Sequence, residues 1–517
     1  MRAGLIAVMA WAVLVFSDTA AQARMGSHLA ALPCWFDLQE GWRTRCYHFT
    51  VPENWDQPDD RPVTMPVVVL IPGPGSGNPT PVLHLMGGPG QPAGITTDRE
   101  LAYWGHLLAQ REWSRNRRHI LMDPRGVGKR ASPELRCSPL SDVRRSLEIE
   151  RLGKGTRAWR QAVERLITGC RNRFLQRGID LSAYTTKNTA RDILALRSAL
   201  NVRRWDLYGV SYGTRLALDL LALDSTGVRA AILDGLDPPH LPTLAEFLYS
   251  VDRSIRLLAA DCAADSACNA QHPELDKAVE RIVNRLRESP VVLDLRPRDG
   301  RRLELLVTDE IFLEALEYAL SYTDWLRFIP ALITLFDKGQ TSLFSHLATT
   351  IIDDPYYFTD ANALALSVRC SAEVPENSAE AFEHTRNALP LLRNLDIELG
   401  ARLQCSTWFP DGVRARPLPD PVSTGVPVLM LSGAYDTRTP PTFGLSQLQT
   451  LPNGYHLIIR NQSHGVSGTS SCAQEAMATF LDDPERFALP ACAEHQTPPD
   501  FVTGFGAPIR NEPLNAQ

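Results

Sequence analysis

Three side chains that together could break an acyl bond occur in this chain, each next to a predicted strand. The first is Ser211, inside Gly209-Val210-Ser211-Tyr212-Gly213. With a strand before it and a helix after it, Gly-x-Ser-x-Gly is typical of a nucleophile elbow, a turn too sharp for side chains at the glycine positions. The bare pattern arises by chance in about one chain in six of this length, so the predicted strand and helix carry the inference. Ser211 is therefore predicted to be a nucleophile beside a helix N-terminus, which favours negative charge.

A serine nucleophile needs a base, and the base needs a group that orients it. Asp436 and His464 each come directly after a predicted strand late in the chain. Either residue by itself would more often be an ordinary turn residue, Asp436 as a cap and His464 as a loop histidine. Their joint placement in the order serine, acid, histidine favours a catalytic triad at the carboxyl edge of one sheet.

Other acids and histidines compete for the same roles. Asp234 and Asp237 follow an earlier strand and are the second choices for the acid. His119 and His456 lie inside predicted strands, and His495 lies in a proline-containing tail without a strand before it. His464 therefore remains the predicted base.

The oxyanion formed during acyl transfer needs two hydrogen-bond donors. One is predicted to be the backbone N–H of Tyr212, the residue after the nucleophile. The other is predicted to come from Gly88, in the glycine-rich run 86–90, where bare backbone can approach a substrate oxygen. An ordinary tight turn is the alternative interpretation of that run.

These residues need a sheet to position them, and strands alternate with helices through much of the chain. Strands are predicted over residues 43–51, 63–71, 81–86, 119–122, 205–210, 230–233, 427–431 and 455–459, and helices over 189–200, 213–223, 441–451 and 472–481. The run 72–79, rich in glycine and proline, is predicted to be a turn. Such alternation predicts a mostly parallel sheet with helices on both faces, here the α/β-hydrolase fold.

The rhythm breaks between residues 241 and 420, which are rich in helical patterns such as 308–319 and 325–336. We predict that 241–420 is a large helical lid inserted into a catalytic domain made of residues 24–240 and 421–517.

Residues 1–23 resemble a secretory signal peptide: Arg2, an apolar run over 5–16, and an Ala-x-Ala exit ending at Ala23. The apolar run is shorter than the ~20 residues that span a bilayer. We therefore predict a secreted or periplasmic protein with no membrane contact after cleavage.

The net charge of -6, with both signs spread along 517 residues, argues against a nucleic-acid binder. The arginine-rich stretches 111–118 and 151–173 are interpreted as solvated helix faces.

The ten cysteines fit an oxidising compartment. Their spacing matches no zinc motif, so no metal site is predicted. Sequence does not determine how they pair, but pairing neighbours in order is attractive because it closes short loops. That hypothesis gives Cys34–Cys46, Cys137–Cys170, Cys262–Cys268, Cys370–Cys405 and Cys472–Cys492.

Five motifs occur in the order found in prolyl aminopeptidases. They are Gly87-Gly88-Pro89-Gly90, Asp123-Pro124-Arg125-Gly126-Val127-Gly128, the Ser211 turn, Asp436 with Thr439-Pro440, and Ser463-His464-Gly465. Over nearly all of the mature chain the protein resembles their larger secreted relatives, the tripeptidyl-aminopeptidase-like hydrolases. It departs from prolyl aminopeptidases at Met86, where they usually have His, and at Pro124, where they usually have Gln, which weakens any transfer of substrate preference.

The resemblance also implies that acidic lid residues hold the free amine of the substrate. Glu373, in the run 367–373, is the candidate amine anchor, with a solvated lid glutamate as the alternative.

The predicted function is thus an exported serine aminopeptidase that needs no cofactor. A carboxylesterase acting on small esters is the alternative, because the same triad serves both reactions. A catalytically silent binding protein is a third hypothesis, which the intact Ser211, Asp436 and His464 argue against. The sequence leaves the oligomeric state open.

Overall fold

The structure is a computed structural model that describes residues 26–36, 42–57, 61–73, 80–96, 104, 107–108, 111–354, 362–395, 397–412 and 416–504. The predicted signal peptide and most of the predicted 72–79 turn lie outside these residues. No described helix is long and apolar enough to cross a membrane.

The described residues form one nine-stranded sheet and one two-stranded sheet. The strands of the large sheet are β1 His28–Leu32, β2 Trp42–Pro52, β3 Pro62–Pro72, β4 Val82–Leu85, β5 His119–Met122, β6 Trp205–Val210, β7 Val228–Asp234, β10 Val428–Gly433 and β11 Gly454–Ile459. Their spatial order is β1-β2-β3-β5-β4-β6-β7-β10-β11. The pairs from β1 to β5 are antiparallel and the pairs from β5 to β11 are parallel. The mostly parallel sheet predicted from the sequence is confirmed.

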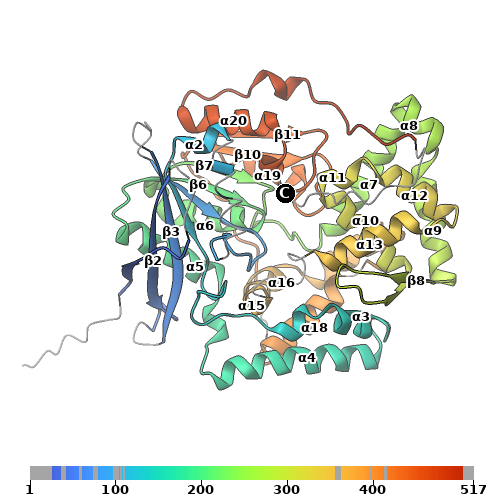
Figure 1. Cartoon of the computed structure of the whole chain (residues 1–517), viewed down its shortest axis with the longest axis horizontal. Coiled ribbons are helices and arrows are strands. Elements are labelled where there is room, and N and C mark those ends of the chain that lie inside the picture. The colour runs from blue at the N-terminus through green and yellow to red at the C-terminus, as the bar shows by residue number, and fades with distance from the viewer. Residues whose placement is uncertain are drawn as a thin grey trace, which may run out of the picture.

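Helices cover both faces of this sheet, because alternate residues of its buried strands are apolar on both sides. In β10, Val428 and Met430 pack toward one core, while Leu429 and Leu431 pack toward the other. The helices outside the predicted insertion are α2 Glu112–Arg115, α3 Val143–Glu150, α4 Arg157–Gln176, α5 Thr186–Ala199, α6 Tyr212–Asp224, α19 Pro441–Leu448 and α20 Ser471–Asp482. Helices α4, α5 and α6 supply the first core, and α2 and α20 the second. Figure 1 shows α20 and α6 on opposite sides of the strands.

The predicted insertion, residues 241–420, falls into two groups of elements (Figure 1). The first is α7 Phe247–Ala264, α8 Ser266–Gln271, α9 Leu275–Glu288, the hairpin β8 Val291–Leu295 and β9 Leu303–Val307, α10 Asp309–Ser321, α11 Thr323–Leu326, α12 Ile329–Asp337 and α13 Ser342–Asp353. It has an apolar core of its own. The second is α15 Asn362–Ser371, α16 Glu373–Glu376, α17 Ala379–Ala388 and α18 Ile397–Trp408. Its buried residues on α15, α16 and α18 join the same core as α4 and the sheet, and α18 lies along α4.

Two details of the insertion differ from the sequence prediction. The helix predicted over 325–336 is two helices, because α11 ends at Leu326 and α12 begins at Ile329. Pro330 explains the break, since proline lacks an N–H and fits a helix only in its first turn. The β8–β9 hairpin was not predicted, although its first strand alternates as a strand does: Val292 and Asp294 are exposed, and Leu293 and Leu295 are buried.

The ten cysteines form five disulfides in the predicted order. The bond Cys137–Cys170 ties the segment before α3 to α4, and Cys370–Cys405 ties α15 to α18. The second helical group is thus cross-linked internally by Cys370–Cys405, while the neighbouring helix α4 has a disulfide of its own.

Candidate active site

Ser211 lies at the turn between β6 and α6, where the sequence predicts it. Its backbone has φ 56° and ψ −128°, a conformation that costs energy for a residue with a side chain. The turn is closely packed, because a Cβ atom on Gly213 would lie 2.0 Å from the carbonyl oxygen of Leu85. The backbone N–H of Ser211 donates to the carbonyl of Asp234 at the end of β7, 2.9 Å away. These are the features expected of a nucleophile elbow.

Asp436 and His464 follow β10 and β11, which are neighbours in the sheet, and their side chains meet. Nδ1 of His464 lies 2.9 Å from Oδ2 of Asp436. Asp436 is fully buried, and its Oδ1 accepts hydrogen bonds from the backbone N–H groups of Arg438 and Thr439 at 2.8 and 2.9 Å. Burial alone would raise the pKa of Asp436. The charge of His464 and the hydrogen bonds from His464 and Thr439 outweigh burial and lower the pKa to about 2.

The hydroxyl of Thr439 is a part of this arrangement that the sequence analysis did not assign. Its Oγ1 lies 2.7 Å from Oδ2 of Asp436 and 3.0 Å from Nδ1 of His464. A signal was present in the sequence. An aspartate that starts a turn commonly accepts from N–H groups two and three residues on, which brings the third residue back to its side chain.

Ser211 and His464 are both neighbours of the end of β7. A Cβ atom on Gly235 would lie 3.2 Å from Cε1 of His464, while the carbonyl of Asp234 accepts from Ser211. Asp234, a second-choice acid, has another role in the structure. Its carboxylate accepts from the backbone N–H groups of Val466 and Ser467 at 3.0 and 2.8 Å and so holds the segment after His464.

The glycine-rich loop after β4 lies against the nucleophile. A Cβ atom on Gly87 would lie 3.1 Å from Cβ of Ser211, which places Gly88 in the next peptide unit of that loop. The side chain of Asp123 accepts from the backbone N–H of Ala93 at 2.6 Å and so ties the loop to the end of β5. Tyr212 begins α6, and its own buried hydroxyl lies 2.9 Å from Oγ1 of Thr186.

Glu373 lies at the start of α16, with 6% of its surface exposed, and its carboxylate is 3.7 Å from the guanidinium of Arg369. It belongs to a group of charges beside α6, where Arg215 forms an ion pair with Glu376. Two half-buried aspartates complete the group: Asp237, and Asp219 on α6 itself, which interacts with Arg215 and Glu376. Burial raises the pKa of Asp237, Arg215 opposes this, and the charges of Glu373 and Glu376 add to the rise, to about 6.

The remaining candidates lie elsewhere. His119 in β5 contacts His84 at 2.8 Å, and Nε2 of His456 in β11 lies 2.9 Å from Oγ of Ser432, so both are occupied inside the sheet as predicted. His495 ends a short 3-10 turn at residues 491–494. Among the described residues, no three His, Cys, Asp or Glu side chains gather in a way that could hold a metal ion.

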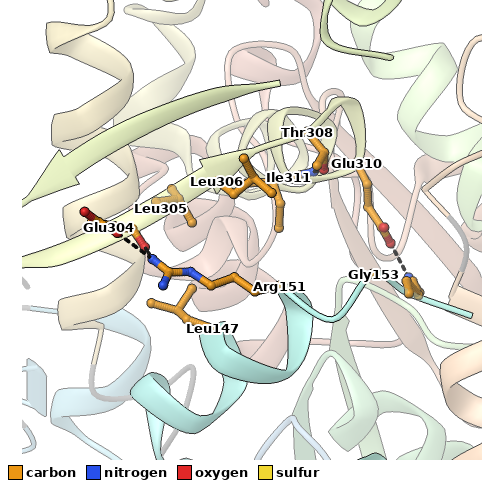
Figure 2. A pocket seen from close by; sticks show the side chains of 10 residues that line it. Leu147, Arg151, Gly153, Glu304, Leu305, Leu306, Thr308, Glu310 and Ile311 are labelled. Atoms are coloured by element: carbon orange, nitrogen blue, oxygen red, sulfur yellow. Dashed lines mark hydrogen bonds and ion pairs between the residues drawn. The ribbon is translucent and has the colours of Figure 1, made fainter. Parts of the chain in front are cut away.

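One surface cleft lies away from these residues, between the turn after α3 and the strand β9 with the start of α10 (Figure 2). Two ion pairs cross it, Arg151 with Glu304 at 3.5 Å and Lys154 with Glu310. The cleft is thus a seam between α3 and the first helical group, and Ser211, Asp436 and His464 do not line it.

Comparison with known proteins gives two family matches. A family described as "alpha/beta hydrolase fold" matches residues 80–270, and one described as "TAP-like protein" matches residues 398–490. Gly88, Ser211 and Tyr212 fall within the first match, and Asp436 and His464 within the second.

Among similar curated proteins, tripeptidyl aminopeptidase of Streptomyces lividans is 24% identical over 495 residues, covering 90% of this chain and 87% of that protein. Serine protease Hip1 of Mycobacterium tuberculosis is 22% identical over 451 residues, covering 84% of each chain. A solved α/β-hydrolase enzyme from a Medee basin deep-sea metagenome library matches with a TM-score of 0.37 and 13% identity, over 82% of this chain and 96% of that one.

Proposed function

We propose that this chain, which belongs to the α/β hydrolases and has a TAP-like segment near its C-terminus, is an exported serine aminopeptidase. In the proposed reaction Oγ of Ser211 attacks a peptide carbonyl while His464 takes the proton and Asp436 holds the imidazole. The N–H groups of Gly88 and Tyr212 donate to the oxyanion. The leaving amine takes the proton from His464, and a water activated by His464 then releases the acyl group from Ser211.

The hydrogen bond between His464 and Asp436 is the observation that carries the hydrolase mechanism. A neutral imidazole whose Nδ1–H donates to a buried carboxylate presents an unprotonated Nε2, which is the form that can accept a proton. The low pKa of Asp436 supports this role, because the acid then stays ionised throughout the pH range in which enzymes work.

The excess of carboxylates beside α6 supports a substrate with a free amine. Glu373, Glu376 and Asp237 face two arginines, and one of these, Arg215, is already paired with Glu376. An ammonium group would balance the remaining charge of Glu373, which is buried, is 3.7 Å from the half-exposed Arg369, and shares the field of Arg215 with Glu376 and Asp237. The two curated relatives named above are a tripeptidyl aminopeptidase and a serine protease, which favours a peptide substrate.

The nucleophile is tested by replacing Ser211 with alanine. We expect the wild-type protein to be labelled by a fluorophosphonate and to cleave its substrate, and Ser211→Ala to do neither. Full activity in Ser211→Ala would exclude the proposed mechanism, whereas an unlabelled wild type would favour the silent binding protein.

The substrate class is tested by comparing alanyl, prolyl and longer peptidyl anilides that have a free amine with their acetylated forms, and with a short-chain aryl ester. An aminopeptidase cleaves only the free-amine compounds, and Glu373→Gln should then raise KM for them by about tenfold, the loss of roughly 1.4 kcal/mol. Glu380 is an exposed glutamate on α17. Glu380→Gln is therefore the matched control and should leave KM unchanged. Equal cleavage of acetylated compounds with fast ester turnover would identify a carboxylesterase.

Export is supported by the five disulfides, which persist in oxidising compartments. N-terminal sequencing of the protein recovered from the periplasm or medium should begin at Arg24. Retention of residues 1–23 on the purified protein would contradict processing at Ala23.

A further inference from the structure

The loop that carries Asp436 is held from outside the sheet by the first helix of the insertion. The guanidinium of Arg253, on α7, donates to the carbonyl of Ala434 at 2.6 Å and to the carbonyl of Asp436 at 2.8 Å. Oγ of Ser254 donates to the carbonyl of Tyr435 at 3.0 Å. Three consecutive main-chain oxygens of the acid loop therefore accept hydrogen bonds from two neighbouring residues of α7.

The hydrogen bonds to Asp436 come from two parts of the chain. Its carboxylate accepts from Arg438, Thr439 and His464, all of them in the catalytic part of the chain. Its main-chain oxygen accepts from Arg253. The arginine thus fixes the backbone from which the carboxylate extends, while both carboxylate oxygens stay bonded to the residues that set their direction.

Arginine has a specific geometric advantage at this place. Its planar guanidinium has donors on separate nitrogens, so it can reach two carbonyls that are two residues apart. A lysine ammonium offers three donors from a single atom and would bridge the same pair less well. Burial lowers the pKa of Arg253, while the negative charge of Asp436 opposes this.

The insertion also holds the loop that carries His464. The backbone N–H of His464 donates to the carbonyl of Ser321 at 3.3 Å, and Oγ of Ser463 donates to the carbonyl of Leu320. Both acceptors lie in the last turn of α10, where helix carbonyls have no partner within the helix. The backbone N–H of Ser463 donates to Oγ1 of Thr323 at the start of α11. The acid loop and the histidine loop therefore both rest on the first helical group.

We propose that Arg253 is a positioning residue for Asp436: by bridging the carbonyls of Ala434 and Asp436 it keeps the carboxylate at the distance that Nδ1 of His464 requires. The first helical group, α7 to α13, is then a fixed support for the loops of Asp436 and His464. This proposal rests on the proposed function, because it assigns Asp436 as the catalytic acid.

The test compares Arg253→Ala and Arg253→Lys with the wild-type full chain, disulfides intact, using a free-amine peptidyl anilide and a fluorophosphonate. We expect Arg253→Ala to lower kcat by about 10- to 100-fold while KM changes by less than about threefold, as is typical when the group that orients a catalytic ligand is removed. Arg253→Lys should recover part of kcat. Added guanidinium ion at low, non-denaturing concentration should raise kcat of Arg253→Ala in a saturable way and leave the wild type unchanged. A merely structural role predicts no such rescue.

Arg256→Ala is the matched control, because Arg256 lies on the same helix, is largely exposed and pairs with Asp252 of α7. It should label and turn over like the wild type. Wild-type kcat in Arg253→Ala, or a loss of kcat that neither lysine nor guanidinium ion restores, would overturn the assignment of Arg253. If Arg253→Ala does not fold, the kcat and KM of Arg253→Lys decide alone, and a kcat equal to wild type would overturn it. A wild type that the fluorophosphonate does not label at Ser211 would instead reject the proposed function itself.

Discussion

At the scale of single residues, the hydroxyl of Thr439 shares the bond between the predicted base and the predicted acid. It is within hydrogen-bond distance of both Oδ2 of Asp436 and Nδ1 of His464. The hydroxyl donates to the carboxylate, so its lone pairs remain on the side of the imidazole N–H. This fixes the orientation of the two side chains relative to each other.

Removing that hydroxyl should weaken catalysis without removing the triad. We expect Thr439→Val to lower kcat by about tenfold, since a hydrogen bond to a charged group contributes about 1.5 kcal/mol or more. Thr439→Ser keeps the hydroxyl and should retain most of the activity. The kcat values of both variants against one peptidyl anilide check this, and equal losses in both would show that packing of the methyl group matters instead.

Asp237 gives the proposed amine site a dependence on pH. Its pKa is raised to about 6, so the side chain is mostly protonated and neutral at pH 5 and mostly charged at pH 7. The amine of a peptide, with a pKa of about 7.7 to 8.0, stays protonated across that window. Burial also raises the pKa of Asp219, on α6, to about 6. As the pH rises through about 6, the carboxylates beside α6 therefore gain negative charge from both aspartates.

A free-amine peptide should accordingly bind more tightly at pH 7 than at pH 5, by about fivefold, or about 1 kcal/mol between partly solvated charges. Calorimetric titration of the Ser211→Ala variant measures this without turnover. Asp237→Asn should show a smaller dependence on pH, and Asp219→Asn combined with Asp237→Asn should bind equally at both values of pH. An acetylated peptide should show no change in any of these proteins. A pH dependence that persists undiminished in the double variant would assign the titration to another group.

At the scale of elements, a buried ion pair joins the segment after β5 to helix α5. Arg125 donates from Nε and Nη2 to the two carboxylate oxygens of Asp192 at 2.7 and 2.6 Å, and its Nη1 donates to the carbonyls of Glu53 and Ala183. Neither Arg125 nor Asp192 is exposed. Asp123, in the same segment, holds the loop that contains Gly88, so the ion pair also supports the predicted oxyanion site.

Breaking one side of this pair should destabilise the fold strongly. Asp192→Ala leaves a buried guanidinium without its carboxylate, and we expect the free energy of unfolding to fall by about 3–5 kcal/mol. Urea unfolding of the disulfide-intact protein measures it. Asp294→Ala, which breaks the exposed ion pair with Arg302 on the β8–β9 hairpin, is the control and should leave the unfolding midpoint unchanged. Comparable effects of the two variants would contradict the structural role assigned to Asp192.

At the scale of the whole molecule, the two helical groups of the insertion are attached to the sheet in different ways. The first has an apolar core separate from those beside the sheet, into which Tyr435 packs, and it meets the loops of Asp436 and His464 through α7 and α10. The second shares its core with α4 and the sheet and is cross-linked by Cys370–Cys405. Glu373 lies three residues after Cys370, so this disulfide also limits where the proposed amine anchor can move.

Removing the bond should therefore affect both stability and substrate binding. The variant Cys370→Ala with Cys405→Ala opens a loop of 35 residues, and chain entropy predicts a loss of about 4 kcal/mol. We expect KM for free-amine substrates to rise as well. Cys472→Ala with Cys492→Ala, which opens a loop of 20 residues in the C-terminal region, should lose about 3 kcal/mol with KM unchanged. Thermal unfolding and KM of both variants check this. An equal change of KM in the two variants would show that Cys370–Cys405 has no specific effect on the amine site.

The sequence by itself determined the parts of this protein that depend on local pattern and chain order. Short apolar runs alternating with helical patterns located every parallel strand of the sheet. Because parallel strands present their carboxyl ends together, the residues after these runs, among them Ser211, Asp436 and His464, were expected at the same edge. Nearest-neighbour pairing of the cysteines was also confirmed, since short loops close most readily.

Only the tertiary structure decided which distant groups support those residues. The bonds of Arg253 to Ala434 and Asp436 span 181 and 183 positions of the chain, and Asp234 reaches Val466 across 232. No periodicity or local motif encodes such a contact, because it forms when two separately folded elements pack together. The break at Pro330 and the β8–β9 hairpin were missed for a different reason. Each has a local sequence signal, a proline in one case and alternating apolar residues in the other, but the whole insertion was predicted to be helical.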